Sequence, residues 1–223
     1  MRPIRQGVRP DLNPLFFVVL SYFLGAVPTS FWLGRAIYGV DLRLKGSGNL
    51  GASNALRVLG WKAALPVVLV DVAKGFGPAW LFPRLEPAPW SWALAYGTAA
   101  ILGHVFSVWV RFKGGKGVAT SAGVFLGLAP WAVLVGFVVW TITVSVTRIV
   151  SLGSVLAALT IPVAVWLLPH DGGWALLTFT VVLAAFVTWA HRANLGRLLR
   201  GEEHRFGEGP GGHVVPPVEA GDR

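Results

Sequence analysis

A polar stretch at residues 46–57 contains the residue types that bind phosphate groups. Its glycines let successive backbone N–H groups turn toward one point, and they are Gly46, Gly48 and Gly51. Its donor side chains are Ser47, Asn49, Ser53, Asn54 and Arg57. The guanidinium of Arg57 can hold a phosphate through two parallel hydrogen bonds. We therefore predict a phosphate-binding loop, while composition alone leaves open a plain polar loop between two hydrophobic segments.

Three further segments carry polar residues suited to binding anions or moving protons. The first is a glycine-rich loop that ends at Lys116. The second has Ser151 and Ser154 at the start of a hydrophobic segment, and the third has His191 and Asn194 just after the last one. Ser151 could instead cap its helix and Asn194 could end one, and the residues alone leave these structural alternatives open.

The composition predicts an integral membrane protein. Of the 223 residues, 54% are hydrophobic, and the mean hydropathy is +0.63. Runs of about 20 apolar residues are long enough to cross the hydrocarbon core as helices. The chain has no cysteine, which excludes a disulfide, a thiolate nucleophile and a thiolate metal site. The net charge of +9 suits anionic lipid headgroups, and it does not indicate nucleic-acid binding because the basic residues are split among short loops.

The hydrophobic pattern predicts an all-α, polytopic fold of seven transmembrane helices with motif-bearing loops. The predicted spans are residues 15–34, 63–82, 90–110, 118–129, 130–147, 152–169 and 174–190. A break at Pro130 places the basic C-terminal segment on the same side as the Lys116 loop, as the positive-inside tendency favours. Residues 118–129 are then short for a full crossing and should be recessed or shielded. We predict a transmembrane domain at 15–207, a basic tail at 1–14 and a disordered tail at 208–223.

Seven spans bring the four polar segments to one face of the membrane. Because most of the 19 lysines and arginines lie there, we predict that this face is cytoplasmic and that the N-terminus lies outside, although the arginines of the N-terminal tail oppose this orientation. Asp71 and Lys74 lie inside a span and should neutralise each other, because an unpaired charge at that depth costs roughly 2.5–3.5 kcal/mol. We expect His104 to be a hydrogen-bonded core residue.

Three stretches of the chain resemble the signature motifs of the PlsY family. They read Gly46-Ser-Gly-Asn-x-Gly-Ala-Ser-Asn-x-x-Arg57, then Gly103-His-x-Phe with Phe112-Lys-Gly-Gly-Lys-Gly-Val-Ala-Thr120, and His191-Arg-x-Asn-Leu-x-Arg-Leu-x-x-Gly-x-Glu203. The resemblance covers residues 15–207, including the order and spacing of the motifs. The departures are Ser53 where threonine is usual, Ser107 where proline is usual and Leu195 where isoleucine is usual. Ser53 keeps the hydroxyl, so the departures do not affect the expected chemistry.

The resemblance implies a membrane acyltransferase of the bacterial inner membrane. Such an enzyme moves a fatty acyl group from acyl phosphate to the 1-hydroxyl of sn-glycerol 3-phosphate and gives lysophosphatidic acid and phosphate, the first committed step of phospholipid synthesis. Its expected partners are these two substrates and the lipid bilayer, with no cofactor and no metal. The loops are short and occupied by the motifs, so we expect no docking of acyl-CoA or acyl carrier protein.

The resemblance also implies roles for individual residues. The predicted catalytic residues are Lys116, His191 and Asn194. The predicted substrate- and phosphate-binding residues are Gly46, Ser47, Gly48, Asn49, Gly51, Ser53, Asn54, Arg57, Ser151 and Ser154. The predicted supporting residues are Asp71, Lys74 and Glu203. Either His191 or a substrate phosphate takes the hydroxyl proton, and the sequence leaves this choice open.

A carrier or channel for phosphorylated anions is the main alternative, since it would also need a basic site with many donors. Such transporters usually contain internal repeats, whereas the polar motifs here differ from one another. A phosphatidyltransferase would need several metal-binding aspartates, and Asp71 is the only acidic residue inside a predicted span. The sequence therefore favours the acyltransferase.

Overall fold

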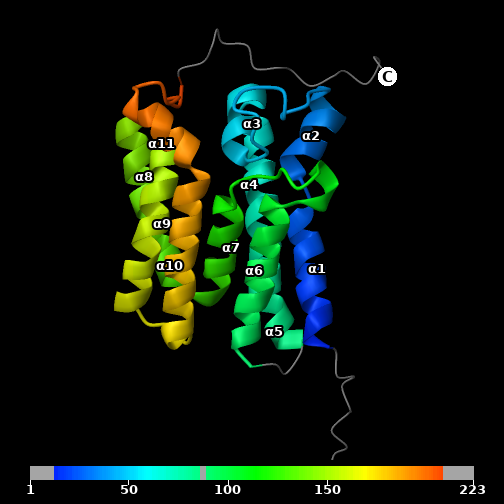
Figure 1. Cartoon of the computed structure of the whole chain (residues 1–223), viewed down its shortest axis with the longest axis vertical. Helices are drawn as coiled ribbons and strands as arrows, with labels where there is room; N and C mark the ends of the chain where they lie inside the picture. Colours follow the sequence, from blue (N-terminus) through cyan, green and yellow to red (C-terminus); the bar gives the residue numbers. More distant parts are fainter. Residues whose placement is uncertain (1–12, 86–88, 208–223) are drawn as a thin grey trace, which may run out of the picture.

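The structure is a computed structural model that describes residues 13–85 and 89–207, and within these ranges every regular element is a helix (Figure 1). The predicted all-α class is confirmed. The basic tail up to residue 12 and the predicted disordered tail at 208–223 lie outside the described residues. The structure therefore covers nearly all of the predicted transmembrane domain.

The first half of the chain forms one group of helices. Their bounds are α1 (Pro14–Ala26), α2 (Thr29–Tyr38), α3 (Ala52–Leu59), α4 (Trp61–Phe76), a π-helical turn (Gly77–Leu81), α5 (Phe82–Leu85) and α6 (Ser91–Val105). A 3-10 turn (Val108–Val110) follows α6. Helix α1 packs along α6 and also contacts α4, while α3 packs on α4 and α2.

The first predicted span is not a single helix, because it breaks between α1 and α2. Pro28 has no N–H to donate, and its ring clashes with the carbonyl group one turn earlier in a regular helix. The carbonyl oxygen of Val27, at the break, accepts a hydrogen bond from Lys74 Nζ at 2.8 Å. A side chain of α4 thus bonds the backbone where α1 and α2 meet. Together α1 and α2 still make a 25-residue segment long enough to cross a membrane.

The second half of the chain forms another group, made of α8 (Pro130–Thr147), α9 (Val150–Leu167), α10 (Gly173–Ala190) and α11 (Arg192–Leu199). Helix α7 (Val118–Leu128) stands between the groups and packs against α4, α6 and α8 (Figure 1). Its contact with α4 joins backbone to backbone. A Cβ atom on Gly75 would lie 2.0 Å from the Thr120 carbonyl oxygen, and one on Gly123 would lie 2.0 Å from the Val72 carbonyl oxygen.

Six described segments are long and apolar enough to cross a membrane, as expected for a polytopic protein. They are Pro14–Tyr38, Trp61–Leu85, Ser91–Val110, Pro130–Thr147, Val150–Leu167 and Gly173–Ala190. The remaining predicted span is α7, whose 11 residues rise only about 16 Å. Helices α4, α6 and α8 shield it, in keeping with the predicted recess. The count of seven crossings stays a prediction, because α7 is too short to span a bilayer alone.

The four polar segments gather toward one end of the bundle, which we call the motif end. It comprises residues 42–60, 111–117, 148–154 and 191–207. In Figure 1, α3 and α11 lie at the upper end, whereas the start of α1 and helix α5 lie at the lower end. The shared end that we predicted from the parity of the spans is therefore present in the fold.

Candidate active site

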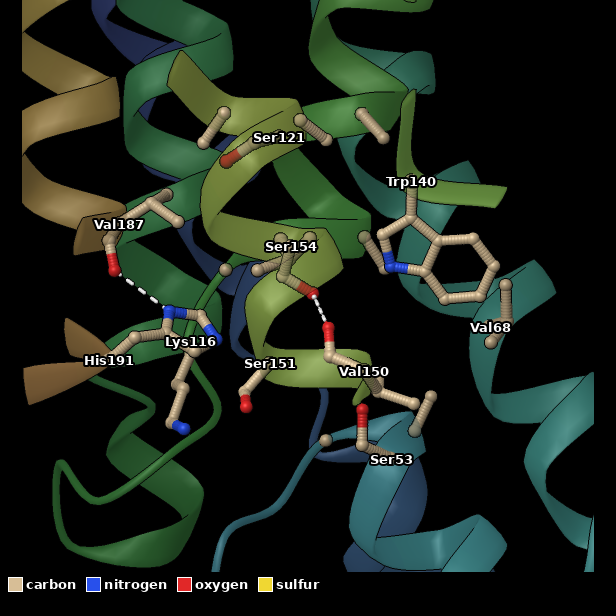
Figure 2. A pocket seen from close by; sticks show the side chains of 18 of the residues that line it. Ser53, Val68, Lys116, Ser121, Trp140, Val150, Ser151, Ser154, Val187 and His191 are labelled. Atoms are coloured by element: carbon tan, nitrogen blue, oxygen red, sulfur yellow. Dashed lines mark hydrogen bonds between the residues drawn. The ribbon is translucent and has the colours of Figure 1, made fainter. Parts of the chain in front are cut away.

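A cavity of about 710 Å³ runs from the motif end into the bundle along α7. Residues from all four polar segments line its outer part, and apolar side chains of α7, α8, α9 and α10 line its inner part. Figure 2 shows the polar side chains of Ser53, Lys116, Ser151 and His191 near one another at this wall. We call the outer part the mouth and the inner part the slot.

The loop of residues 46–57 is shaped from within by the buried side chain of Asn54. Its amide nitrogen donates hydrogen bonds to the carbonyl oxygens of Leu42 and Lys45, both at 3.1 Å. Its amide oxygen accepts from the N–H of Ser47 at 2.8 Å. Both amide hydrogens of Asn54 are thus used on the loop backbone, so this side chain holds the shape of the loop that we predicted to bind phosphate.

The other predicted residues of this loop divide between the turn and the cavity. Gly46 and Gly48 have positive φ angles of 59° and 71° and shape the turn without lining the cavity. The residues that line the mouth are Ser47, Asn49, Gly51, Ser53 and Arg57. Burial lowers the pKa of Arg57, although a guanidinium stays charged at neutral pH.

Lys116 reaches the mouth from a tight loop that lies on the end of α6. The Gly114 N–H donates to the Val105 carbonyl oxygen at 2.9 Å, and the Gly115 N–H donates to that of His104 at 3.2 Å. A Cβ atom on Gly114 would lie 1.9 Å from the His104 carbonyl oxygen. The glycine pair is therefore what allows the loop to approach α6 so closely.

The Lys116 ammonium group lies in an unfavourable place for a positive charge. Its Nζ donates to Asn194 Oδ1, which joins the Lys116 loop to the segment that carries His191 and Asn194. Burial, helped by the positive charges of Arg197 and Arg57, lowers the pKa of Lys116 to about 8. The group is thus charged at neutral pH but loses its proton more easily than an exposed lysine.

Glu203 lines the cavity and accepts hydrogen bonds from three polar side chains. Its Oε1 accepts from Asn194 Nδ2 at 2.6 Å and from Ser151 Oγ at 2.8 Å, and its Oε2 accepts from Arg197 Nε at 2.8 Å. Burial alone would raise the pKa of Glu203, but these hydrogen bonds lower it below its usual value. Ser151 lies inside α9 and Asn194 lies inside α11, and neither residue occupies a cap position. The helix-cap alternatives therefore do not apply, and both side chains bond Glu203 instead.

His191 and Ser154 face the cavity from the ends of α10 and α9. The Nδ1 of His191 lies 2.8 Å from the Val187 carbonyl oxygen, which can only accept, so Nδ1 carries the proton and Nε2 has a free lone pair. Burial, together with the charge of Lys116, lowers the pKa of His191 to about 4, so the ring is neutral at pH 7. Ser154 Oγ donates to the Val150 carbonyl oxygen at 2.9 Å.

Asp71 and Lys74 form the buried pair that the sequence predicts. Lys74 Nζ lies 2.7 Å from Asp71 Oδ1, and the side chains are only 6% and 3% exposed, respectively. His104 is 6% exposed and its Nδ1 lies 3.7 Å from the same carboxylate oxygen, so the expected core position is confirmed, whereas the expected hydrogen bond stays a prediction. Asp71 also lines the cavity, whereas Lys74 does not.

A sequence model described as glycerol-3-phosphate acyltransferase matches residues 15–201. The chain belongs to the glycerol-3-phosphate acyltransferase family. The glycerol-3-phosphate acyltransferase of Trichlorobacter lovleyi is 45% identical over 195 residues, which cover 86% of this chain and 97% of the relative. That of Fusobacterium nucleatum is 42% identical over 190 residues, which cover 85% of this chain and 96% of the relative.

Solved structures of PlsY, an integral membrane glycerol 3-phosphate acyltransferase, share the fold. The glycerol 3-phosphate form matches with a TM-score of 0.80 and 37% identity, covering 87% of this chain and 96% of that one. The lysophosphatidic acid form matches with a TM-score of 0.79 and 36% identity, covering 87% and 95%. The resemblance to the PlsY family is thus confirmed, and the chain is a membrane acyltransferase rather than a carrier or channel.

Two parts of the cavity wall were not predicted from the sequence. Residues 204–207 line the mouth, and the Phe206 N–H donates to the Arg148 carbonyl oxygen at 2.5 Å. Their signal was a basic residue, Arg205, two positions after the end of the last motif. The slot is lined by apolar residues such as Phe125 and Leu183. Hydrophobicity could not single these out, because the spans that carry them are apolar throughout.

Glu203→Ala should destabilise the C-terminal side of the site, because it leaves three hydrogen-bond donors without their acceptor. We expect a loss of about 2 kcal/mol or more in the free energy of unfolding, with faster amide exchange in residues 192–207. Glu202→Ala is the matched control, because the partner of Glu202 is the exposed Arg200 and such pairs contribute about 0–1 kcal/mol. Thermal unfolding in detergent compares the two, and equal losses would contradict the role of Glu203.

Proposed function

We propose that the chain transfers a fatty acyl group from acyl phosphate to the 1-hydroxyl of sn-glycerol 3-phosphate and releases lysophosphatidic acid and inorganic phosphate. The observation that carries the proposal is a single cavity whose cationic, hydroxyl-rich mouth continues into an apolar slot. Both substrates have a phosphate for the mouth, and the acyl chain suits the slot. The glycerol 3-phosphate and lysophosphatidic acid forms of PlsY support the acceptor and the product.

The donor groups of the mouth suit two phosphates. We assign one phosphate to Ser47, Arg57 and Lys116. We assign the other phosphate, or the glycerol hydroxyls, to Ser154, His191 and Asn194. Glu203 orients the Asn194 amide: its carboxylate accepts from the amide nitrogen, which leaves the amide oxygen to accept from Lys116. Asp71 and Lys74 support the wall from within the bundle.

The proposed reaction needs binding and charge stabilisation more than a protein nucleophile, because the mixed anhydride of acyl phosphate is already activated. The glycerol oxygen attacks the carbonyl carbon and loses its proton. The bond from this carbon to the phosphate oxygen then breaks, and inorganic phosphate leaves. Holding the two anions together supplies proximity, and the cations and donors of the mouth stabilise developing negative charge.

Two groups can take the hydroxyl proton. The free Nε2 of His191 is one, but a pKa of about 4 makes it a weak base at neutral pH. A substrate phosphate is the other, and the second pKa of a phosphate monoester is about 6, closer to neutral pH. These values favour the phosphate as the acceptor, with His191 as a hydrogen-bonding partner of the substrates.

The motif end is proposed to face the cytoplasm of a bacterial cell, with the enzyme in the inner membrane and the N-terminus outside. Most of the lysines and arginines of the chain lie in the segments of the motif end, and cytoplasmic loops of membrane proteins carry an excess of these residues. In this orientation glycerol 3-phosphate enters from the cytoplasm and the acyl chain from the bilayer.

Palmitoyl phosphate should support turnover with glycerol 3-phosphate, without added metal or nucleotide, whereas palmitoyl-CoA and palmitoyl carrier protein should give none above background. The reason is that the short loops of the motif end are occupied by the phosphate motifs. Lysophosphatidic acid is measured by mass spectrometry. Arg57→Lys is the negative control, because lysine lacks the planar two-donor fork. Comparable rates with palmitoyl-CoA would overturn the assignment of the donor.

The kcat/KM for glycerol 3-phosphate should fall as the pH rises through about 8. Lys116, whose pKa is about 8, is protonated below this pH and neutral above it, so its attraction for phosphate is lost on the alkaline side. The substrate itself does not titrate there, because its second pKa is about 6. Lys116→Arg keeps the charge and should move the alkaline limb beyond the measurable range. A limb that stays near pH 8 in this variant would show that another group titrates.

A further inference from the structure

One buried hydroxyl of the cavity wall has no hydrogen-bond partner. Among the described residues, the buried side-chain atoms that lack one are the hydroxyl oxygens of Ser30, Thr120 and Ser121. Of these three residues, Ser121 lines the cavity, and it is 7% exposed. In Figure 2, Ser121 lies beyond Ser154 and His191 as seen from Ser53. Because an unpaired buried hydroxyl destabilises a fold, this one indicates an acceptor on a bound ligand.

The first turn of α7 faces the same cavity. Its N-cap is Gly117, with a φ of 81°, which has no side chain to accept hydrogen bonds from the helix. Gly117, Val118 and Ala119 all line the cavity. The first N–H groups of a helix have no partner inside it, and its N-terminus carries a partial positive charge. Helix α7 therefore presents backbone donors and its dipole to the cavity that contains the Ser121 hydroxyl.

The position of Ser121 fits the carbonyl group of acyl phosphate. Lys116, just before α7, belongs to the mouth, and Phe125, one turn beyond Ser121, belongs to the slot. Ser121 follows Gly117 by four residues, or about 6 Å along the helix axis. The acyl carbonyl joins the phosphate to the hydrocarbon chain, so it has to lie where the mouth meets the slot.

We propose that the Ser121 hydroxyl, with the N–H groups of Val118 and Ala119, donates hydrogen bonds to the acyl carbonyl oxygen. This inference rests on the proposed function. When the glycerol oxygen bonds to the carbonyl carbon, the carbonyl electron pair moves onto this oxygen, where the three donors stabilise the charge. When the pair returns, the bond to the phosphate oxygen breaks and inorganic phosphate leaves. The glycerol proton goes to the base described above, so Ser121 is a catalytic residue that transfers no proton.

Ser121→Ala tests this role by kinetics with palmitoyl phosphate and glycerol 3-phosphate. We expect kcat to fall by about 10- to 100-fold, somewhat less than for a sole oxyanion donor because the backbone donors remain. The KM for glycerol 3-phosphate should not change. The melting temperature of the unliganded variant should equal or exceed that of the wild type, since an unpaired buried hydroxyl is removed. Ser30→Ala removes another unpaired hydroxyl, outside the cavity wall, and should leave kcat unchanged.

A matched pair of inhibitors tests the contact itself. In 2-oxoheptadecylphosphonate a CH₂ group replaces the bridging oxygen of palmitoyl phosphate and the carbonyl is kept, whereas heptadecylphosphonate has no carbonyl. Ser121→Ala should weaken inhibition by the ketone about fivefold, as expected for the loss of one hydrogen bond. Inhibition by the alkyl compound should stay the same, because both compounds fill the slot alike.

The outcomes separate this inference from the proposed function. If the wild type does not turn over palmitoyl phosphate, the proposed function fails and the carbonyl contact fails with it. If the wild type is active but Ser121→Ala keeps the wild-type kcat, or loses affinity for both phosphonates equally, the carbonyl contact alone is wrong. A lower kcat combined with selective loss of the ketone supports it.

Discussion

The site depends on two cations, Arg57 and Lys116, that are partly buried in one cavity. Burial lowers the pKa of both groups, and the charge of Arg57 lowers that of Lys116 further. Such charges destabilise the folded chain unless an opposite charge offsets them. Glu203 is the carboxylate that attracts both, and its three hydrogen bonds keep it in place. In the proposed function, the negative charge of a bound phosphate offsets the same two cations, so their burial favours phosphate binding.

The helices have to keep the cavity open while holding its wall firmly. Helix α7 provides both, because it joins the two helix groups and still leaves one face toward the cavity. Its contact with α4 is tight because Gly75 and Gly123 allow the backbones to touch. The buried pair of Asp71 and Lys74 adds a link from α4 to the break after α1. The contacts with α4 thus position α7 and, with it, Lys116 just before its first turn.

The sequence was sufficient to predict which segments meet, but not what each side chain does there. Apolar runs and the bias of basic residues placed the polar segments at one end, since both properties are visible without a structure. Asn54 has the residue type of a phosphate ligand, yet its amide hydrogens hold the loop, which depends on the folded path of residues 42–45. The slot could not be predicted, because side chains that face lipid and those that face the slot are both apolar. The role of Ser121 depends on the absence of a partner for its hydroxyl among the described residues, which residue type cannot reveal.

The most direct test is the change in melting temperature that sn-glycerol 3-phosphate causes in detergent, for the wild type and for the double variant Arg57→Leu/Lys116→Met. At a ligand concentration about 100 times Kd, the wild type should melt about 5–10 °C higher than without ligand. The double variant should show no ligand shift, because the two cations that are proposed to bind the phosphate are gone. A ligand shift that persists in the double variant would contradict the account.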